Sequence, residues 1–149
     1  MKVSFSVRGT PKPAGSKRGF ANKKTGRVVM VDASGQAGKD HRHDIRCTAQ
    51  DAMAGTEPTR HAVTVSVTFF FDRPKSHYRS GARCAELRPD APTSHARTPD
   101  IDKLCRQVLD GMTGIVFVDD SQVTSIHAKK RYGAAATMVD VWSNDARGT

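Results

Sequence analysis

A chain of 149 residues, 37% of them hydrophobic, can bury one substantial core but is too short for two ordinary domains, so we expect a single domain over residues 1–149. The formal net charge of +9 favours a polyanionic partner such as nucleic acid, although a solvated basic surface would give the same composition. No apolar run is long enough to cross a bilayer, and the N-terminus lacks the continuous apolar stretch of a secretion signal, which predicts a cytoplasmic protein without a membrane partner.

The first half of the chain alternates between strand patterns and a basic segment. Alternating apolar residues predict a strand at residues 2–8, and residues 12–27, rich in Lys, Arg, Gly and Ser, are expected to form a mobile basic loop. A short strand is expected at 27–31, and helical spacing of apolar residues predicts a helix over 39–53. The clearest strand lies at 61–71, where Val and Phe alternate with Thr and Ser.

The second half begins with a long connection. Residues 72–98 show no sustained period and are rich in Arg, which favours a segment that contacts the substrate. Thr98-Pro99 is expected to cap a helix with an apolar stripe over 101–112, and strands at 122–132 and 134–142 are expected to form a final hairpin. The order β-β-α-β-α-β-β predicts an α+β fold, a two-layer sandwich in which two helices pack on one face of a mixed sheet.

Five of the fifteen acidic residues fall within twenty-one positions of this otherwise basic chain: Asp100, Asp102, Asp110, Asp119 and Asp120. At a helix entrance Asp100 can be extended while Asp102 occupies the first turn, so both carboxylates can converge on one point. A tight return from the short helix can bring Asp120 to the same place, whereas Asp110 is expected at the surface. Converging carboxylates repel unless a cation lies among them, and hard oxygen ligands suit Mg²⁺ or Mn²⁺. We therefore predict a metal site formed by Asp100, Asp102 and Asp120.

Each element of this site also has a structural explanation when it is taken alone. Aspartates at a helix N-terminus complement the helix dipole, and Asp119-Asp120 would make an ordinary polar turn before a strand. Arg106, one helical turn after Asp102, would either stabilise charge on a phosphate or form a salt bridge with Asp102. The combination favours a metal-dependent nuclease, in which the ion polarises the scissile phosphate and activates water.

Basic residues outside the acidic cluster are candidates for contacts with DNA phosphates, although solvated surface charge would explain each of them separately. The predicted contacts are Lys12, Lys17, Arg18, Arg73, Lys75, Lys129 and Lys130. The six histidines form no metal-binding arrangement beyond His41-Arg-His43, and the three cysteines form no CxxC pair, so none of them is assigned to a metal or to catalysis.

The segment PDIDKLCRQVLDGMTGIVFVDDSQV, residues 99–123, resembles the RusA family of Holliday junction resolvases, which are common in phages and prophages. The family pattern is roughly D-x-D-N-L-x-K, an apolar helix leading to D-A-L, and then D-D-x-Q-V. The similarity extends upstream through RPKSHYRSG, residues 73–81, and through the first strand with GTPKPAGSKR, so that it covers most of the chain. The resemblance implies a homodimeric, Mg²⁺-dependent endonuclease of recombination and repair, which binds four-way DNA junctions and makes paired, symmetrical nicks.

Position by position, the resemblance places the metal-binding aspartates of the family at Asp100, Asp102 and Asp120. The catalytic lysine of the family is replaced by Arg106, which keeps the positive charge but cannot give up a proton, and the family asparagine is replaced by Lys103. Because all three metal positions are kept, the resemblance favours an active enzyme. The alternatives are a non-catalytic protein that binds branched DNA, supported by the two replacements, and a less selective nuclease that acts on flaps or forks.

Overall fold

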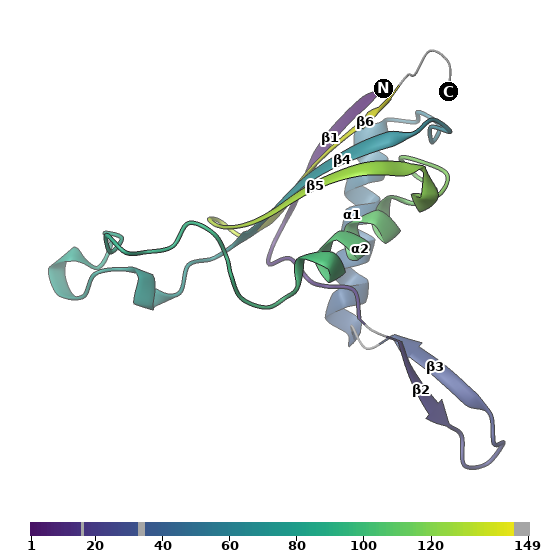
Figure 1. Cartoon of the computed structure of the whole chain (residues 1–149), viewed down its shortest axis with the longest axis horizontal. Helices are drawn as coiled ribbons and strands as arrows, with labels where there is room; N and C mark the ends of the chain where they lie inside the picture. Colours follow the sequence, from purple (N-terminus) through teal and green to yellow (C-terminus); the bar gives the residue numbers. More distant parts are fainter. Residues whose placement is uncertain (16, 33–34, 145–149) are drawn as a thin grey trace.

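The computed structural model describes residues 1–15, 17–32 and 35–144, and Figure 1 shows a two-layer core from which two segments project. The strands are β1 (Lys2–Arg8), β2 (Lys17–Ala21), β3 (Val28–Asp32), β4 (Val63–Phe71), β5 (Val123–Tyr132) and β6 (Ala136–Ser143), and the helices are α1 (Gly35–Met53) and α2 (Ile101–Met112). Across the described ranges, no helix has the length and hydropathy required to span a membrane.

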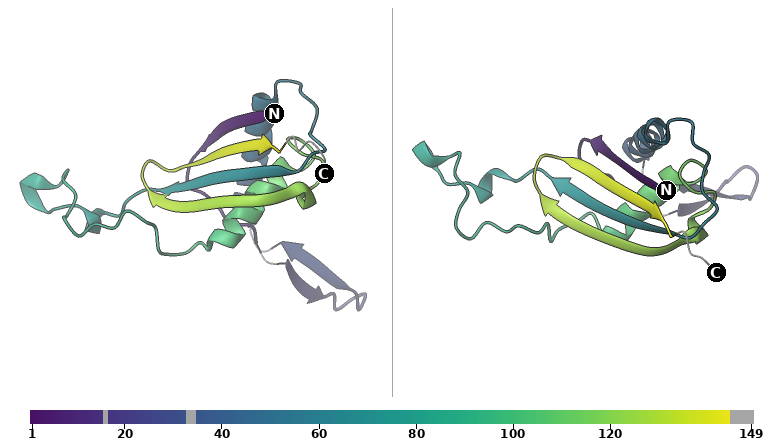
Figure 2. Two further views of the ribbon diagram at one scale, coloured as in Figure 1. Left: turned by 45° about the horizontal axis from the view of Figure 1, so that its top comes forward. Right: turned by 90° about the horizontal axis from the view of Figure 1, so that it is seen from above.

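The main sheet has the strand order β1-β6-β4-β5, with β4 and β5 parallel and the other neighbours antiparallel. The prediction of a final hairpin was wrong, because β4 lies between β5 and β6 and pairs with both. Alternation along β4 buries Val65, Val67 and Phe69 on the face where the register also places Val139 and Val141 of β6. Both helices cover this one face, as Figures 1 and 2 show. The predicted α+β class with a mixed sheet is therefore confirmed.

The two helices complete the core with apolar residues at helical spacing. They are Ile45, Ala49 and Met53 of α1 and Leu104, Val108 and Met112 of α2, all of them buried. The helices approach closely at Gly111, where an added Cβ would lie 2.6 Å from Cγ2 of Ile45. Only a residue without a side chain fits at this point, so Gly111 sets how closely α2 packs against α1.

The sequence-based prediction was wrong for part of the basic loop, because residues 17–21 form β2. This strand pairs with β3 in an antiparallel hairpin that lies outside the main sheet and projects from the core (Figure 1). The sequence KRGFA contains a single large apolar residue, Phe20, so it has no alternating pattern of its own. The strand forms because the apolar strand Val28–Asp32 offers it a backbone partner across a short turn.

The helix starts also differ from the prediction. Helix α1 begins at residue 35 rather than 39, and α2 is preceded by Asp100 at the N-cap position rather than by Thr98. Asp100 has an extended backbone, with φ −71° and ψ 140°, and its carbonyl accepts the first helical hydrogen bond, from the N–H of Leu104 at 3.1 Å. The chain therefore turns into the helix two residues later than the Thr98-Pro99 pattern indicated.

Residues 72–98, which we call the arm, are an ordered projection. The outward and returning halves pair at Tyr78 and Leu87, and the return joins the edge of β5 through an antiparallel bridge between Ser94 and Arg131. The N–H of Tyr132 donates to the carbonyl of Thr93 at 3.1 Å and reinforces this junction. Figure 2 shows the arm extending well beyond the sheet.

A cluster of rings, which we call the ring cluster, holds the base of the arm. His95 of the arm stacks on Phe71 of β4 with ring centroids 4.0 Å apart, and Tyr132 of β5 meets His77 edge-on at 4.7 Å. The guanidinium of Arg73 lies 5.2 Å from the centre of the Tyr132 ring. Burial lowers the pKa of His95, and the positive charge of Lys130 adds to this effect, so the histidine is neutral in the stack near pH 7.

Replacing Gly111 with alanine tests the close contact between the helices. Helix propensity alone would stabilise the variant by up to about 1 kcal/mol, whereas the contact with Ile45 predicts destabilisation by roughly 1–3 kcal/mol. Chemical denaturation measures the difference. The loss should be smaller in an Ile45→Ala background, and a Gly111→Ala protein more stable than the parent would refute this account of the packing.

Candidate active site

The first turn of α2 presents the two aspartates of the PDID sequence in different backbone conformations. Asp100 is extended at the N-cap and its carboxylate caps no backbone N–H, while Asp102 lies in the first helical turn. The carboxylate of Asp100 instead faces Lys103, with 3.9 Å between Oδ2 and Nζ. Both partners are substantially exposed, so the ion pair is weak and can be exchanged for another ligand.

A cavity of about 420 Å³ lies between α2 and the sheet edge, and we call it the α2–β5 cavity. Its polar residues are Asp102, Arg106, Asp110 and Asp120, and its apolar residues are Ile101, Cys105, Leu109, Ile126 and Ala128. The apolar wall arises because α2 carries a second apolar row beside β5, of which Cys105 and Leu109 also pack against the edge of the core. The cavity therefore combines an apolar lining with three carboxylates and one guanidinium.

A second cavity, of about 500 Å³, lies on another face of the same helical turn, and we call it the entrance cavity. It is lined by Thr10, Pro11, Lys12, Pro13, Phe71, Thr98, Pro99, Asp100 and Lys103. The N–H of Ala14 donates to the carbonyl of Lys103 at 3.0 Å and fixes the loop after β1 against α2. Two ammonium groups and one carboxylate thus meet in a space that a phosphate group can enter.

The three predicted metal ligands are divided between these two cavities. Asp102 and Asp120 line the α2–β5 cavity, and Asp100 lines the entrance cavity. As the side chains stand in residues 1–15, 17–32 and 35–144, no three His, Cys, Asp or Glu residues are close enough together to hold a metal ion. The structure therefore brings two of the predicted ligands to one cavity and leaves the third on the adjoining face of α2.

The DDSQ turn that carries Asp120 is held by hydrogen bonds from its neighbours. The carboxylate of Asp119 caps the 3-10 turn Asp120–Gln122 and accepts a hydrogen bond from the hydroxyl of Ser121 at 2.6 Å. This hydroxyl, together with the N–H groups of Asp120 and Ser121, lowers the pKa of Asp119. The stabilisation is present above the ordinary pKa of 3.8 and is lost as the pH falls through the lowered value. Asp119 thus stabilises a polar turn before β5, which is the structural explanation considered for Asp119-Asp120.

Gln122 joins this turn to the segment before β4. Its side-chain amide donates to the carbonyls of Thr59 and His61, each at 2.9 Å, and its Oε1 accepts from the N–H of Asp119 at 2.8 Å. Three hydrogen bonds from one side chain fix the turn where the parallel strands β4 and β5 begin. The position of Asp120 in the lining of the α2–β5 cavity follows from this attachment.

Two further side chains of α2 limit the chemistry of the α2–β5 cavity. Arg106 is exposed and, among the residues that the structure describes, forms no ion pair with Asp102, so the salt-bridge alternative does not apply. Burial raises the pKa of Cys105 to about 11, with a further contribution from the charge of Asp102. Its thiol is therefore protonated at neutral pH and supplies no thiolate ligand, which leaves carboxylate oxygens as the available donors.

Two of the predicted DNA contacts make bonds inside the protein. Arg73 donates to the carbonyl of Pro92 at 2.7 Å and lies over Tyr132 in the ring cluster. The ammonium of Lys130 donates to the carbonyl of Arg97. Both side chains hold the returning half of the arm against the sheet, which is a structural use that their positions in the sequence did not indicate.

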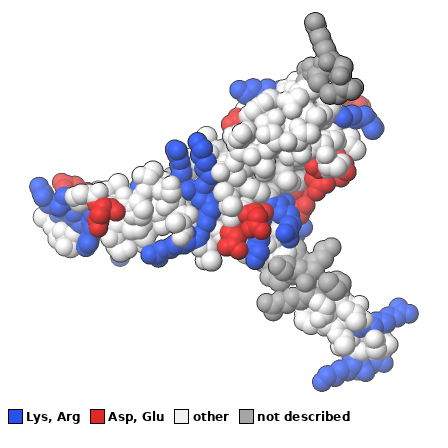
Figure 3. Space-filling model, in the orientation of Figure 1, with Lys and Arg blue, Asp and Glu red and all other residues white. Residues whose placement is uncertain are grey.

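The other predicted DNA contacts fall in two groups. Lys12, Lys75 and Lys129 are exposed, whereas the side chains of Lys17 and Arg18 lie outside the described part of the chain. Figure 3 shows basic side chains over the arm and at the tip of the β2–β3 hairpin, with acidic side chains on the core between them. This charge pattern would attract DNA to the two projections and leave the carboxylates between them.

Lys103 and Asp110 line the two cavities but were not predicted as site residues from the sequence. Lys103 follows Asp100 by three positions, and this helical spacing could have indicated the contact between them. Asp110 was expected at the surface but is half-buried and lines the α2–β5 cavity. Its place on the same side of α2 as Asp102 and Arg106 could have been read from the helical period.

Comparison with known proteins identifies one family. The profile described as Endodeoxyribonuclease RusA matches residues 9–142, nearly the whole chain, and the matched range includes both cavities and the arm. No curated protein matches the chain.

Removing the side chain of Gln122 tests the attachment of the DDSQ turn. Gln122→Ala leaves the partly buried carbonyl of Thr59 without its partner, so we expect a loss of about 1–3 kcal/mol in the free energy of unfolding. Ser121→Ala removes one exposed hydrogen bond of the same turn and should cost clearly less. Equal stabilities of the two variants in urea denaturation would contradict the proposed attachment.

Proposed function

We propose, because the chain belongs to the RusA endodeoxyribonuclease family, that it resolves four-way DNA junctions by paired, symmetrical nicks that depend on Mg²⁺. Membership of the family indicates an endodeoxyribonuclease that acts on branched DNA. The observation that carries the proposal is the presence of Asp102, Asp120 and Arg106 around one cavity between α2 and β5. Carboxylates and a guanidinium around one cavity are the groups that phosphodiester hydrolysis needs.

The donor set of this cavity fits a hard divalent cation. Asp102 and Asp120 offer carboxylate oxygens, and the protonated thiol of Cys105 offers no competing soft ligand. Asp102 and Asp120 would hold Mg²⁺ or Mn²⁺, and Asp100 would join them on releasing Lys103. When bound, such an ion supplies positive charge that polarises the scissile phosphate and eases deprotonation of the attacking water.

The remaining residues of the two cavities would position the DNA strand. Arg106 offers a planar guanidinium that can bind two phosphate oxygens and stabilise their developing charge. Lys12 and Lys103 would bind a phosphate in the entrance cavity, next to the positive end of the α2 dipole. An arginine cannot act as a general acid, so the role of Arg106 in this proposal is electrostatic.

A homodimer is the assembly that this reaction requires. Cutting two strands of a symmetric junction calls for two equivalent active sites, which a two-fold axis provides. The further parts of the proposal, a cytoplasmic role in recombination and repair and an origin in a phage or prophage, rest on the resemblance to the family.

A second candidate function is binding of branched DNA without cutting, or with a less selective nuclease activity. The ion pair between Asp100 and Lys103 favours it, because it holds one carboxylate away from the other two. Incubating labelled four-way junction, fork and linear duplex with the protein, with Mg²⁺ or with EDTA, separates the functions. Resolution predicts Mg²⁺-dependent, symmetrically placed nicks in the junction alone.

Conversion of Asp120 to asparagine should lower the rate of junction nicking by about 100-fold or more, since the ion would lose a charged ligand. Binding of the junction without metal should be unchanged or tighter, because removing negative charge cannot weaken attraction to phosphate. Asp51→Asn on the exposed surface of α1 is the matched control and should cut like the parent. Nicking of the junction by Asp120→Asn at the parental rate would exclude the assigned role.

Variants of Arg106 test whether its role is electrostatic. Arg106→Lys should retain most of the nicking rate, and Arg106→Gln should lose it by about 10- to 1000-fold, because the neutral amide cannot offset phosphate charge. A pH–rate profile adds a second readout. Only the lysine variant should gain a dependence on a group that deprotonates near pH 10. Comparable rates for the glutamine variant and the parent would show that the guanidinium is not used.

A further inference from the structure

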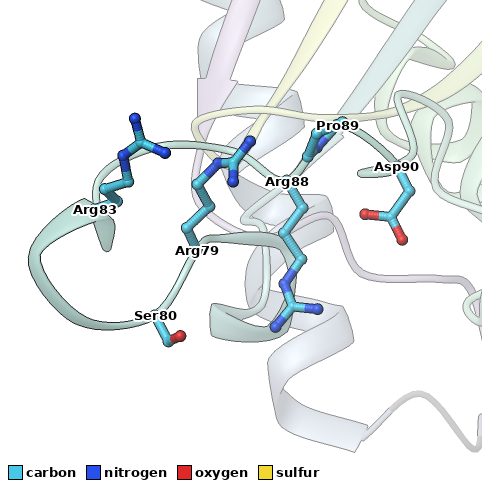
Figure 4. Close-up of a pocket in the computed structure, with 6 residues that line it drawn as sticks. All are labelled: Arg79, Ser80, Arg83, Arg88, Pro89 and Asp90. Carbon is cyan, nitrogen blue, oxygen red and sulfur yellow. The ribbon is translucent and has the colours of Figure 1, made fainter.

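The outer part of the arm contains a pocket of about 370 Å³ that the proposed reaction does not use. Its lining consists of Arg79, Ser80, Arg83, Arg88, Pro89 and Asp90, which Figure 4 shows around the loop of the arm. In Figure 1 this loop lies at the end of the arm remote from α2. Three arginines therefore surround one hollow at a distance from both cavities of the candidate active site.

Backbone pairing fixes two of these arginines on facing halves of the arm. The N–H of Arg79 donates to the carbonyl of Glu86 at 2.8 Å, and the N–H of Arg88 donates to the carbonyl of His77 at 2.9 Å. The side chain of Arg88 is held as well, because its Nε donates to the carbonyl of Tyr78 at 3.2 Å. The pocket is thus built on hydrogen-bonded backbone rather than on a free loop.

The acidic residues nearby do not neutralise the three guanidinium groups. Glu86 lies 3.7 Å from Nε of both Arg79 and Arg83, longer than a direct hydrogen bond, and all three side chains are substantially exposed. Asp90 is the acidic residue among those that line the pocket. Within the described ranges, the two terminal nitrogens of Arg88 have no hydrogen-bond partner. These side chains therefore give the pocket a net positive charge, and the terminal nitrogens of Arg88 remain able to donate hydrogen bonds to a ligand.

We propose that this pocket binds a phosphodiester of a duplex DNA arm away from the branch point, an inference that rests on the proposed junction-resolving function. Guanidinium groups match the oxygens of a phosphate in two-point contacts, and Ser80 adds a hydroxyl donor. The lining has no aromatic ring on which an unpaired base could stack and no side-chain amide that could read a base edge. The contact is therefore to the backbone and is independent of sequence.

The ring cluster attaches the arm that carries this pocket to the main sheet. Phe71 and Tyr132 of the sheet hold the base of the arm through His95 and His77, so the arm projects the pocket away from the candidate active site. A second contact at this place favours DNA whose duplex arms extend from the branch point toward the pocket. The pocket would select branched DNA with arms long enough to reach it.

The double variant Arg79→Gln, Arg83→Gln tests the inference and keeps Arg88, which supports the backbone. Lys2→Gln with Lys39→Gln removes the same charge from exposed positions of β1 and α1 and is the control. Affinity for a four-way junction is measured without divalent metal, over a range of salt concentrations, with long duplex arms and with arms shortened stepwise. Circular dichroism and thermal unfolding verify that both proteins fold.

On DNA with long duplex arms, the Arg79→Gln, Arg83→Gln protein should bind about 10-fold more weakly than the control. The dependence of its log affinity on log salt concentration should be shallower by about 0.9 for each phosphate that the variant no longer neutralises. The two variants should become equal once the DNA arms are too short to reach the pocket. Equal affinities on long arms would overturn the inference, as would a deficit that persists on the shortest arms. Cutting is not part of this measurement, so a protein that binds but never nicks would refute the proposed function separately.

Discussion

The burial of α2 on two sides is the constraint on which the candidate active site depends. One apolar row of the helix, including Leu104 and Val108, fills the core, and a second row faces β5. Gly111 lets the helix approach α1 closely enough for both contacts to form. Helix α2 is thereby held along β5, and Gln122 attaches the DDSQ turn at the start of that strand to the chain before β4. Hydrophobic packing thus brings aspartates from two elements to one cavity.

The same sheet supports the arm and the candidate active site. Strand β5 begins beside the DDSQ turn and ends at Tyr132 in the ring cluster, where the arm returns toward α2. The return leads through Pro99 and Asp100 directly into the first turn of the helix. Strand β5 therefore connects the α2–β5 cavity, where we propose that DNA is cut, to the base of the arm, which we propose binds DNA.

The helices and strands whose apolar residues recur at regular spacing could be predicted from the sequence, and those that depend on tertiary contacts could not. Strand 61–71 and helix 101–112 have clear apolar patterns, and their predicted positions are close to those observed. Strand β2 lacks such a pattern because its partner strand, rather than its own side chains, supports it. For the site, the sequence indicated the aspartates, but it could not separate Arg73 as an arm anchor from an exposed phosphate contact.

The central claim is that Asp102 and Asp120 hold a divalent ion together and that Asp100 joins them. The most direct measurement is a crystal structure of the protein with Mn²⁺, in which anomalous scattering locates the ion. We expect a single region of Mn²⁺ density with carboxylate oxygens of Asp102 and Asp120 at about 2.0–2.4 Å, and Asp100 turned from Lys103 toward it. Manganese bound only at other carboxylates, with Asp120 beyond the reach of the ion and its waters, would contradict the account.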